Sequence, residues 1–171
     1  MKKELRTLIV AALFIALTYI FTAFINIQIP PGNPAGLTHL GNIPVFIAAM
    51  LFGKRTGAAV GGIGMALFDF FSPYAVWAPF TLVINALMGF VIALIVENRE
   101  KFKWYLLAVV AAIAIKVGGY YIAEGILYGN WIAPVVAIPA NILQVAVAAV
   151  VVLPIIGRLR LVVQRAEGSN S

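Results

Sequence analysis

Cysteine is absent from the 171 residues, histidine occurs once, and charged residues make up only 11% of the chain. Without cysteine the chain can form no disulfide and no thiolate metal site, and one histidine is too few for a metal site built on imidazole ligands. We therefore expect no metal and no cofactor. The sequence also contains no phosphate-binding P-loop and no GxSxG nucleophile motif. These absences argue against an enzyme, and they leave any ATP hydrolysis to other proteins.

Hydrophobic residues account for 63% of the chain, and the mean hydropathy is +1.04. Soluble domains are about a quarter charged, so this composition indicates a lipid environment. A membrane span needs about 20 apolar residues, and the length therefore allows about six spans. We predict an all-α polytopic membrane protein with a single transmembrane domain over residues 1–171. Its expected spans are residues 7–25, 40–52, 57–71, 76–96, 104–127 and 132–156, followed by a polar cytoplasmic tail, 157–171.

The positive charges test this topology. The chain contains 12 lysines and arginines, and all except Lys116 fall in segments that share one side if the N-terminus is cytoplasmic. Loops on the cytoplasmic side carry an excess of lysine and arginine, so we expect both termini inside. The same distribution explains the net charge of +6 through membrane topology, so this charge does not indicate nucleic-acid binding. The cytoplasmic set is Lys2, Lys3, Arg6, Lys54, Arg55, Arg99, Lys101, Lys103, Arg158, Arg160 and Arg165.

Four ionisable residues lie outside these segments: His39, Asp69, Lys116 and Glu124. Lys116 is about 18 Å into the fifth span at 1.5 Å per residue, and charges at such depth tend to face a cavity or a partner. Tyr120 and Glu124 follow at steps of four, which places all three on one helix face. Together with other polar residues in the outer half of the bilayer, they predict a pocket open to the outside. The candidate substrate-binding residues are His39, Asn42, Trp77, Lys116, Tyr120, Glu124, Asn141 and Gln144.

Each of these assignments has a structural alternative. Lys116 and Glu124 could pair with one another or extend to the interface, Asp69 could be a surface residue, and His39 could cap a helix. The three tryptophans all fall near predicted interfaces, where an aromatic belt is the usual role. A polar segment with Pro30, Pro31 and Pro34 cannot be helical throughout, and it would cover the pocket.

Small residues mark two further helix faces. Ala12 and Ala16 form a small-xxx-small pair in the inner half of the first span, and four glycines line the third. Such residues let helix backbones approach closely. Packing within the chain is the simpler interpretation for the glycines, whereas for the alanines internal packing and docking of a partner remain equally open.

The small size, the six spans, the alanine pair and the long first loop resemble the substrate-binding S components of energy-coupling factor (ECF) vitamin transporters. The segment from Thr38 to Ile95 is especially similar to the hydroxymethylpyrimidine- and pyridoxine-type members. This resemblance implies a bacterial cell-membrane protein that captures a vitamin outside, docks on a transmembrane coupling subunit bound to two ATPase subunits, and releases its cargo inside. Ala12 and Ala16 match the alanine motif that contacts the coupling subunit. The binding residues differ with each vitamin and do not transfer by motif.

Pocket chemistry favours pyridoxine or the hydroxymethylpyrimidine precursor of thiamine, with stacking on an aromatic ring. Pantothenate comes next, because Lys116 or His39 could bind its carboxylate, whereas riboflavin and folate are bulkier than these compact loops require. The main alternative function is an autonomous proton-coupled carrier or channel, in which Lys116, Asp69 and Glu124 would relay protons. An enzyme acting on lipids is disfavoured, because no metal cluster or nucleophile motif is present.

Overall fold

The computed structural model describes residues 3–28, 37–99 and 101–168. The predicted proline-rich segment, residues 29–36, lies outside the described residues. The elements follow the order α1 (Lys3–Phe24), β1 (Asn26–Gln28), β2 (Leu37–His39), α2 (Asn42–Phe70), η2 (Ala75–Trp77), α3 (Ala78–Val96), α4 (Phe102–Tyr128), η3 (Ala133–Ala137) and α5 (Ile138–Gly168).

Five helical segments of the described chain are long and apolar enough to cross a membrane, where the sequence analysis expects six. The difference lies in α2, which contains both the second and the third expected span. Gly53, inside α2, has a non-helical backbone with φ 84° and ψ −174°. A side chain is rarely tolerated at such a φ, whereas glycine adopts it readily.

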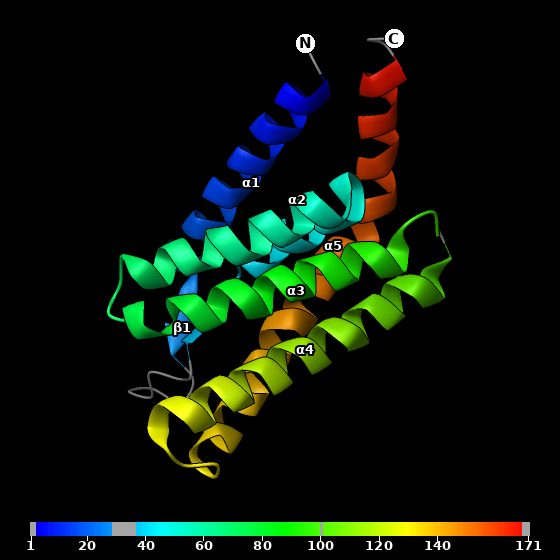
Figure 1. Ribbon diagram of the computed structural model, residues 1–171. Helices are drawn as coiled ribbons and strands as arrows, with labels where there is room; N and C mark the ends of the chain where they lie inside the picture. Colours follow the sequence, from blue (N-terminus) through cyan, green and yellow to red (C-terminus); the bar gives the residue numbers. More distant parts are fainter. Residues whose placement is uncertain (1–2, 29–36, 100, 169–171) are drawn as a thin grey trace.

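The two halves of α2 run back along each other. A Cβ atom built on Gly57 would lie 2.8 Å from Cβ of Ala49, and one on Gly61 would lie 3.2 Å from Cγ1 of Val45. These pairs are placed symmetrically about Gly53, which is the signature of a helical hairpin. Figure 1 shows the same reversal at the end of α2.

Glycines hold α2 close to its neighbours. A Cβ on Gly57 would lie 2.7 Å from the carbonyl oxygen of Gly89 in α3, and one on Gly64 would lie 2.7 Å from Cβ of Thr18 in α1. A Cβ on Gly61 would collide with the carbonyl of Asn85. The glycines of the third expected span therefore serve packing within the chain, because their missing side chains allow backbone contact.

The core lies between α2, α3, α4 and α5. Its fully buried members include Phe46 and Met65 of α2, Met88 of α3, Ala112 of α4 and Val145 of α5. Large apolar side chains are also exposed over the outside of the bundle, notably on α1, α4 and α5. Water would not stabilise such a surface, and a lipid environment would.

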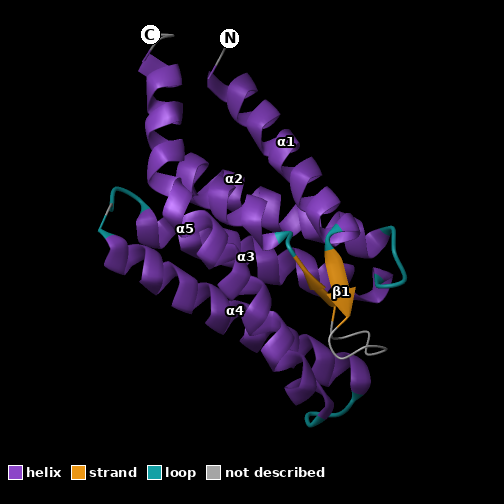
Figure 2. Cartoon of the chain, turned by 180° about the vertical axis from the view of Figure 1, so that it is seen from behind, coloured by secondary structure: helices purple, strands orange, loops and turns teal. Residues whose placement is uncertain are grey.

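A short antiparallel ribbon joins α1 to α2, with Asn26 opposite His39 and Gln28 opposite Leu37. The backbone N–H of Leu40 continues the pairing by donating to the carbonyl of Ile25 at 3.1 Å. The all-α prediction did not include these strands. They lie on either side of the proline-rich segment. Figure 2 shows the ribbon below α1, at the end of the bundle opposite the two termini.

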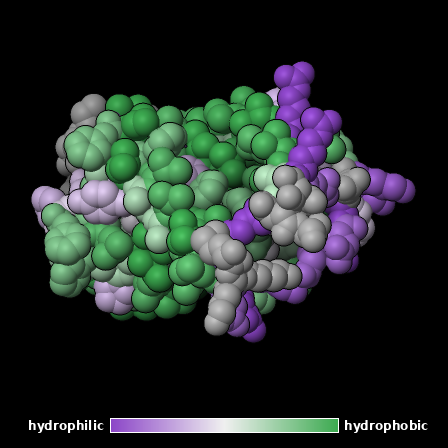
Figure 3. Space-filling model, turned by 90° about the horizontal axis from the view of Figure 1, so that it is seen from above, coloured by the Kyte–Doolittle hydropathy of each residue, from purple (hydrophilic) through white to green (hydrophobic). Residues whose placement is uncertain are grey.

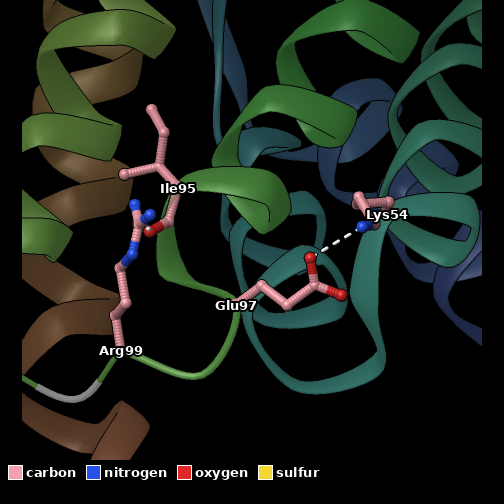
Figure 4. A network of polar contacts seen from close by, with 4 residues as sticks. All are labelled: Lys54, Ile95, Glu97 and Arg99. Carbon is pink, nitrogen blue, oxygen red and sulfur yellow. Dashed lines mark hydrogen bonds and ion pairs between the residues drawn. The ribbon is translucent and has the colours of Figure 1, made fainter.

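Hydrophilic residues gather at one end of the bundle (Figure 3), and this end carries both chain termini (Figure 1). We call this the basic end. It contains the turn at Gly53, the connection between α3 and α4, and the last turns of α5. Lys54 Nζ forms an ion pair with Glu97 Oε2 at 2.6 Å, and Arg99 donates to the carbonyl of Ile95 at 3.1 Å (Figure 4). α5 continues as a helix to Gly168 and includes most of the predicted polar tail.

Candidate functional site

A pocket lies at the end opposite the basic end, and the space between its walls, open solvent included, is about 460 Å³. The chain contributes to it from β2, α2, the α2–α3 connection, α3, α4 and α5. Its lining residues are Leu37, His39, Asp69, Tyr74, Trp77, Thr81, Lys116, Tyr120, Glu124, Asn141 and Gln144.

α4 supplies a row of three lining residues at steps of four: Lys116, Tyr120 and Glu124. Lys116 is 1% exposed, and its Nζ lies 3.4 Å from Oδ1 of the fully buried Asn42. The same Nζ is 5.5 Å from the centroid of the Tyr120 ring. A buried ammonium is stable only where such polar and aromatic partners replace water.

Glu124 is 2% exposed and does not form an ion pair with Lys116 among the described contacts. Its Oε2 atom is buried without a hydrogen-bond partner among the described residues. The structure therefore contradicts the alternative in which Lys116 and Glu124 satisfy each other. Asp69 is buried and lines the same pocket. The alternative in which Asp69 is a surface residue is therefore wrong.

The Tyr120 hydroxyl is held by α3. It lies 3.0 Å from Oγ1 of Thr81, and Asn85 Nδ2 donates to it, also at 3.0 Å. The Trp77 ring is tilted 41° to the Tyr120 ring, with centroids 6.4 Å apart, and Tyr128 packs edge-on against Trp77 at 5.8 Å. These rings form an aromatic wall on which a flat ligand can stack.

His39 ends β2, at the turn that leads into α2. It lines the pocket, and its Nδ1 accepts a hydrogen bond from the backbone N–H of Gly41 at 3.2 Å. Because Nδ1 is an acceptor here, the ring proton is on Nε2. The pKa of His39 is well below its ordinary value of 6.5. Burial of the ring is the larger cause, and the nearby charge of Lys116 is the smaller one.

α5 supplies two amides to the pocket. Gln144 Nε2 donates to the carbonyl of Leu37 in β2 at 2.9 Å, and its Oε1 is buried without a partner among the described residues. Asn141 Nδ2 donates to the carbonyl of Ala137, one helical turn earlier, at 3.2 Å. Gln144 thus connects the helix bundle to the strand that precedes α2.

Of the eight candidate binding residues, all except Asn42 line the pocket. Asn42 lies behind Lys116 and contacts it. Thr81 is not among the predicted binding residues, although Trp77, Thr81 and Asn85 repeat the step of four that identified the face of α4. Leu37 had no comparable signal, because it contributes its backbone carbonyl.

Comparisons with known proteins agree with this architecture. The family model described as "ECF-type riboflavin transporter, S component" matches residues 2–161. The chain is 30% identical over 159 residues to the "Thiamine precursor transporter HmpT" of Lactococcus lactis subsp. cremoris. The aligned region covers 91% of this chain and 90% of that protein. The chain is also 33% identical over 108 residues to an uncharacterized protein of Pyrococcus woesei, which covers 63% of this chain and 71% of that one.

A solved structure described as the S component of a bacterial ECF transporter shares the fold. Its TM-score is 0.72 at 22% identity, and the match covers 94% of this chain and 99% of that one. The resemblance seen in the sequence is thereby confirmed. This is a family of multi-pass membrane transport proteins and not of enzymes. The chain belongs to the S components of ECF-type transporters, within the family whose model is described as the riboflavin transporter S component.

Proposed function

We propose that this chain captures a small, hydroxylated heteroaromatic vitamin or vitamin precursor and presents it for import. The observation that carries the proposal is the pocket itself, in which buried carboxylates, a buried ammonium and an aromatic wall meet in one cavity. Buried polar groups without protein partners are costly, and a polar ligand would supply the missing partners.

The charges favour an amine or hydroxyl ligand over a carboxylate. Asp69 and Glu124 face a single lysine, Lys116, in the pocket. A further carboxylate, brought by a ligand, would meet more negative than positive charge, which disfavours pantothenate. A pyrimidine or pyridine ring with hydroxyl groups could stack on Trp77 and Tyr120. The name of the Lactococcus relative, a thiamine precursor transporter, supports hydroxymethylpyrimidine first and pyridoxine second.

The topology that we propose has six crossings, with both termini in the cytoplasm of a bacterial cell. The hairpin at Gly53 supports it, because each half of α2 would then be a short span. The gathering of basic residues at the end that carries both termini also supports it. In this orientation the pocket opens to the outside.

Docking on an ECF module is the second part of the proposal. Ala12 and Ala16 are both exposed on α1, as are the neighbouring Leu13 and Leu17. Only 11% of the apolar stretch of this helix is buried within the chain. A face of small residues on such a helix would let a coupling helix approach closely, and the ATPase subunits bound to that partner would supply the energy.

Calorimetric titration of the purified chain tests the capture role. The titrants are hydroxymethylpyrimidine, pyridoxine, pantothenate and riboflavin, and Trp77 fluorescence gives a second readout. A Trp104→Phe, Trp131→Phe variant keeps Trp77 as the pocket reporter, because Trp104 is at the basic end against Arg99. We expect tight, saturable binding of one of the first two compounds.

Absence of binding to every compound would contradict a capture subunit. Uptake into vesicles that contain this chain alone would instead favour the autonomous proton-coupled carrier. Tight binding of riboflavin or pantothenate alone would contradict the proposed substrate class and leave the capture role in place.

A further inference from the structure

Two buried acceptor atoms on the pocket lining have no partner among the described residues. They are Oε2 of Glu124 and Oε1 of Gln144, on side chains that are 2% and 4% exposed. Buried polar atoms of proteins are nearly always hydrogen-bonded. A ligand that fits this pocket must therefore bring hydrogen-bond donors to these two oxygens.

The direction of the Gln144 amide is fixed by the backbone of β2. Its Nε2 donates to the carbonyl of Leu37 at 2.9 Å, and a carbonyl can only accept. Turning the amide over would set two oxygens against each other and lose this bond. The bond to Leu37 therefore holds Oε1 of Gln144 in place as an acceptor, and one N–H of the amide remains beside it.

Two other neutral polar residues of the pocket already have partners within the protein. Asn141 Nδ2 donates to Ala137, and the Tyr120 hydroxyl is held by Thr81 and Asn85. Donors that can serve a ligand include the Lys116 ammonium, the indole N–H of Trp77, and Nε2–H of His39, whose Nδ1 is occupied by Gly41. The pocket thus combines fixed acceptors on α4 and α5 with donors from Lys116 and His39.

We propose that Gln144, held by Leu37, makes this site select a ring amino group over an oxo group at the same ring position. The inference rests on the proposed function and narrows it from hydroxylated heteroaromatic rings to aminopyrimidines. An amino group donates N–H to Oε1 of Gln144, while an adjacent ring nitrogen can accept from Lys116 or His39. Glu124 Oε2 accepts a second donor, either the other N–H or the hydroxymethyl O–H. An oxo group would place an acceptor against the acceptor of Gln144.

The test compares two probes on the full chain by calorimetry. One is hydroxymethylpyrimidine, and the other is the analogue in which an oxo group replaces the ring amino group. Sites built to hydrogen-bond a ligand group reject analogues that lack it by large factors. We expect the wild-type protein to prefer the amino compound by about 100-fold, since a buried acceptor is otherwise left unpaired.

Gln144→Met removes the acceptor while keeping the length of the side chain. The amino-to-oxo preference should then fall to within about threefold, because neither compound can bond at this position. A ratio measured within one variant cancels general losses of stability or packing. Thr81→Val is the matched control, since Thr81 supports Tyr120, and it should weaken both compounds while keeping their ratio.

A second variant keeps the inference testable if Gln144→Met does not fold. Gln144→Leu removes the same acceptor with a branched side chain, so the amino-to-oxo preference should again fall to within about threefold, and its survival there would equally overturn the inference. The inference is overturned if wild-type protein binds both compounds equally, or if the preference survives in Gln144→Met. If the protein still binds hydroxymethylpyrimidine tightly, either of these two results leaves the proposed function in place. Binding of neither pyrimidine would overturn the substrate class and this inference together.

Discussion

The Nζ atom of Lys116 lies 3.4 Å from Oδ1 of Asn42, and both side chains are almost completely buried. The two residues come from different helices and are separated by 74 positions in the sequence. The contact orients the ammonium from behind while leaving it on the pocket wall. We therefore expect Asn42 to position Lys116.

Removing this support should weaken ligand binding without abolishing the fold. Asn42→Leu leaves Lys116 without its side-chain acceptor, and we expect a loss of affinity of about tenfold, the scale of an unmade buried hydrogen bond. Titration of the ligand that the wild-type protein binds measures the change. Lys103→Met, at the basic end, is the control and should have no effect. Unchanged affinity in Asn42→Leu would remove Asn42 from the site.

A bulky side chain on the exposed alanine face of α1 should separate capture from transport. In Ala12→Leu or Ala16→Leu we expect ligand affinity within about twofold of the wild type, because the pocket is at the other end of the bundle and exposed substitutions there disturb little. Uptake in cells and co-purification with the coupling subunit should be lost. Ala114→Leu places the same change on an exposed position of α4 and should preserve both. Full uptake by both α1 variants would contradict the docking role.

The close approach of α2 and α3 predicts opposite effects for two glycine-to-alanine changes. A Cβ on Gly61 would collide with the Asn85 carbonyl, whereas a Cβ on Gly118 of α4 meets nothing within 4 Å. Gly61→Ala should therefore destabilise the protein by about 1–3 kcal/mol, the usual cost of overpacking. Gly118→Ala should stabilise it by up to about 1 kcal/mol through helix propensity. Thermal unfolding in detergent compares the two, and equal melting temperatures would contradict the described packing.

The ion pair between Lys54 and Glu97 (Figure 4) should contribute little to stability. Its side chains are 34% and 48% exposed, and partly exposed pairs are worth about 0–1 kcal/mol because water and salt screen them. Glu97→Gln should accordingly shift the melting temperature only slightly, and less at high salt. A large shift would mean that the pair has a role in the fold beyond its contact.

The lowered pKa of His39 predicts that the folded protein loses stability at acidic pH. This pKa is held well below 6.5 in the fold, so an unfolded chain binds the proton more readily. The stabilising contribution is complete above about pH 6.5 and is lost as pH falls from there toward the folded-state pKa. Melting temperatures between neutral and mildly acidic pH measure it. Since the chain has a single histidine, His39→Gln should flatten the profile in this window. An unchanged profile would mean that a group other than His39 causes the loss.

The amino-acid sequence alone determined the class of the protein and much of its pocket. Long apolar segments specify membrane helices because the bilayer tolerates no unpaired backbone, and the steps of four at Lys116, Tyr120 and Glu124 place their side chains on one face before any fold is known. A lysine deep in an apolar segment already indicates a cavity, because its charge needs a partner. The family resemblance rested on the same local patterns.

Only the tertiary structure decided how distant groups satisfy one another. The carbonyl of Leu37 fixes the Gln144 amide, and Asn42 supports Lys116 from another helix. Neither contact leaves a trace in local periodicity, because each joins segments that are far apart in sequence. The hairpin at Gly53 likewise depends on its positive φ and on backbone contacts that only a glycine allows. Local patterns therefore determine which residues share a helix face, whereas packing between helices determines which atoms remain without a partner.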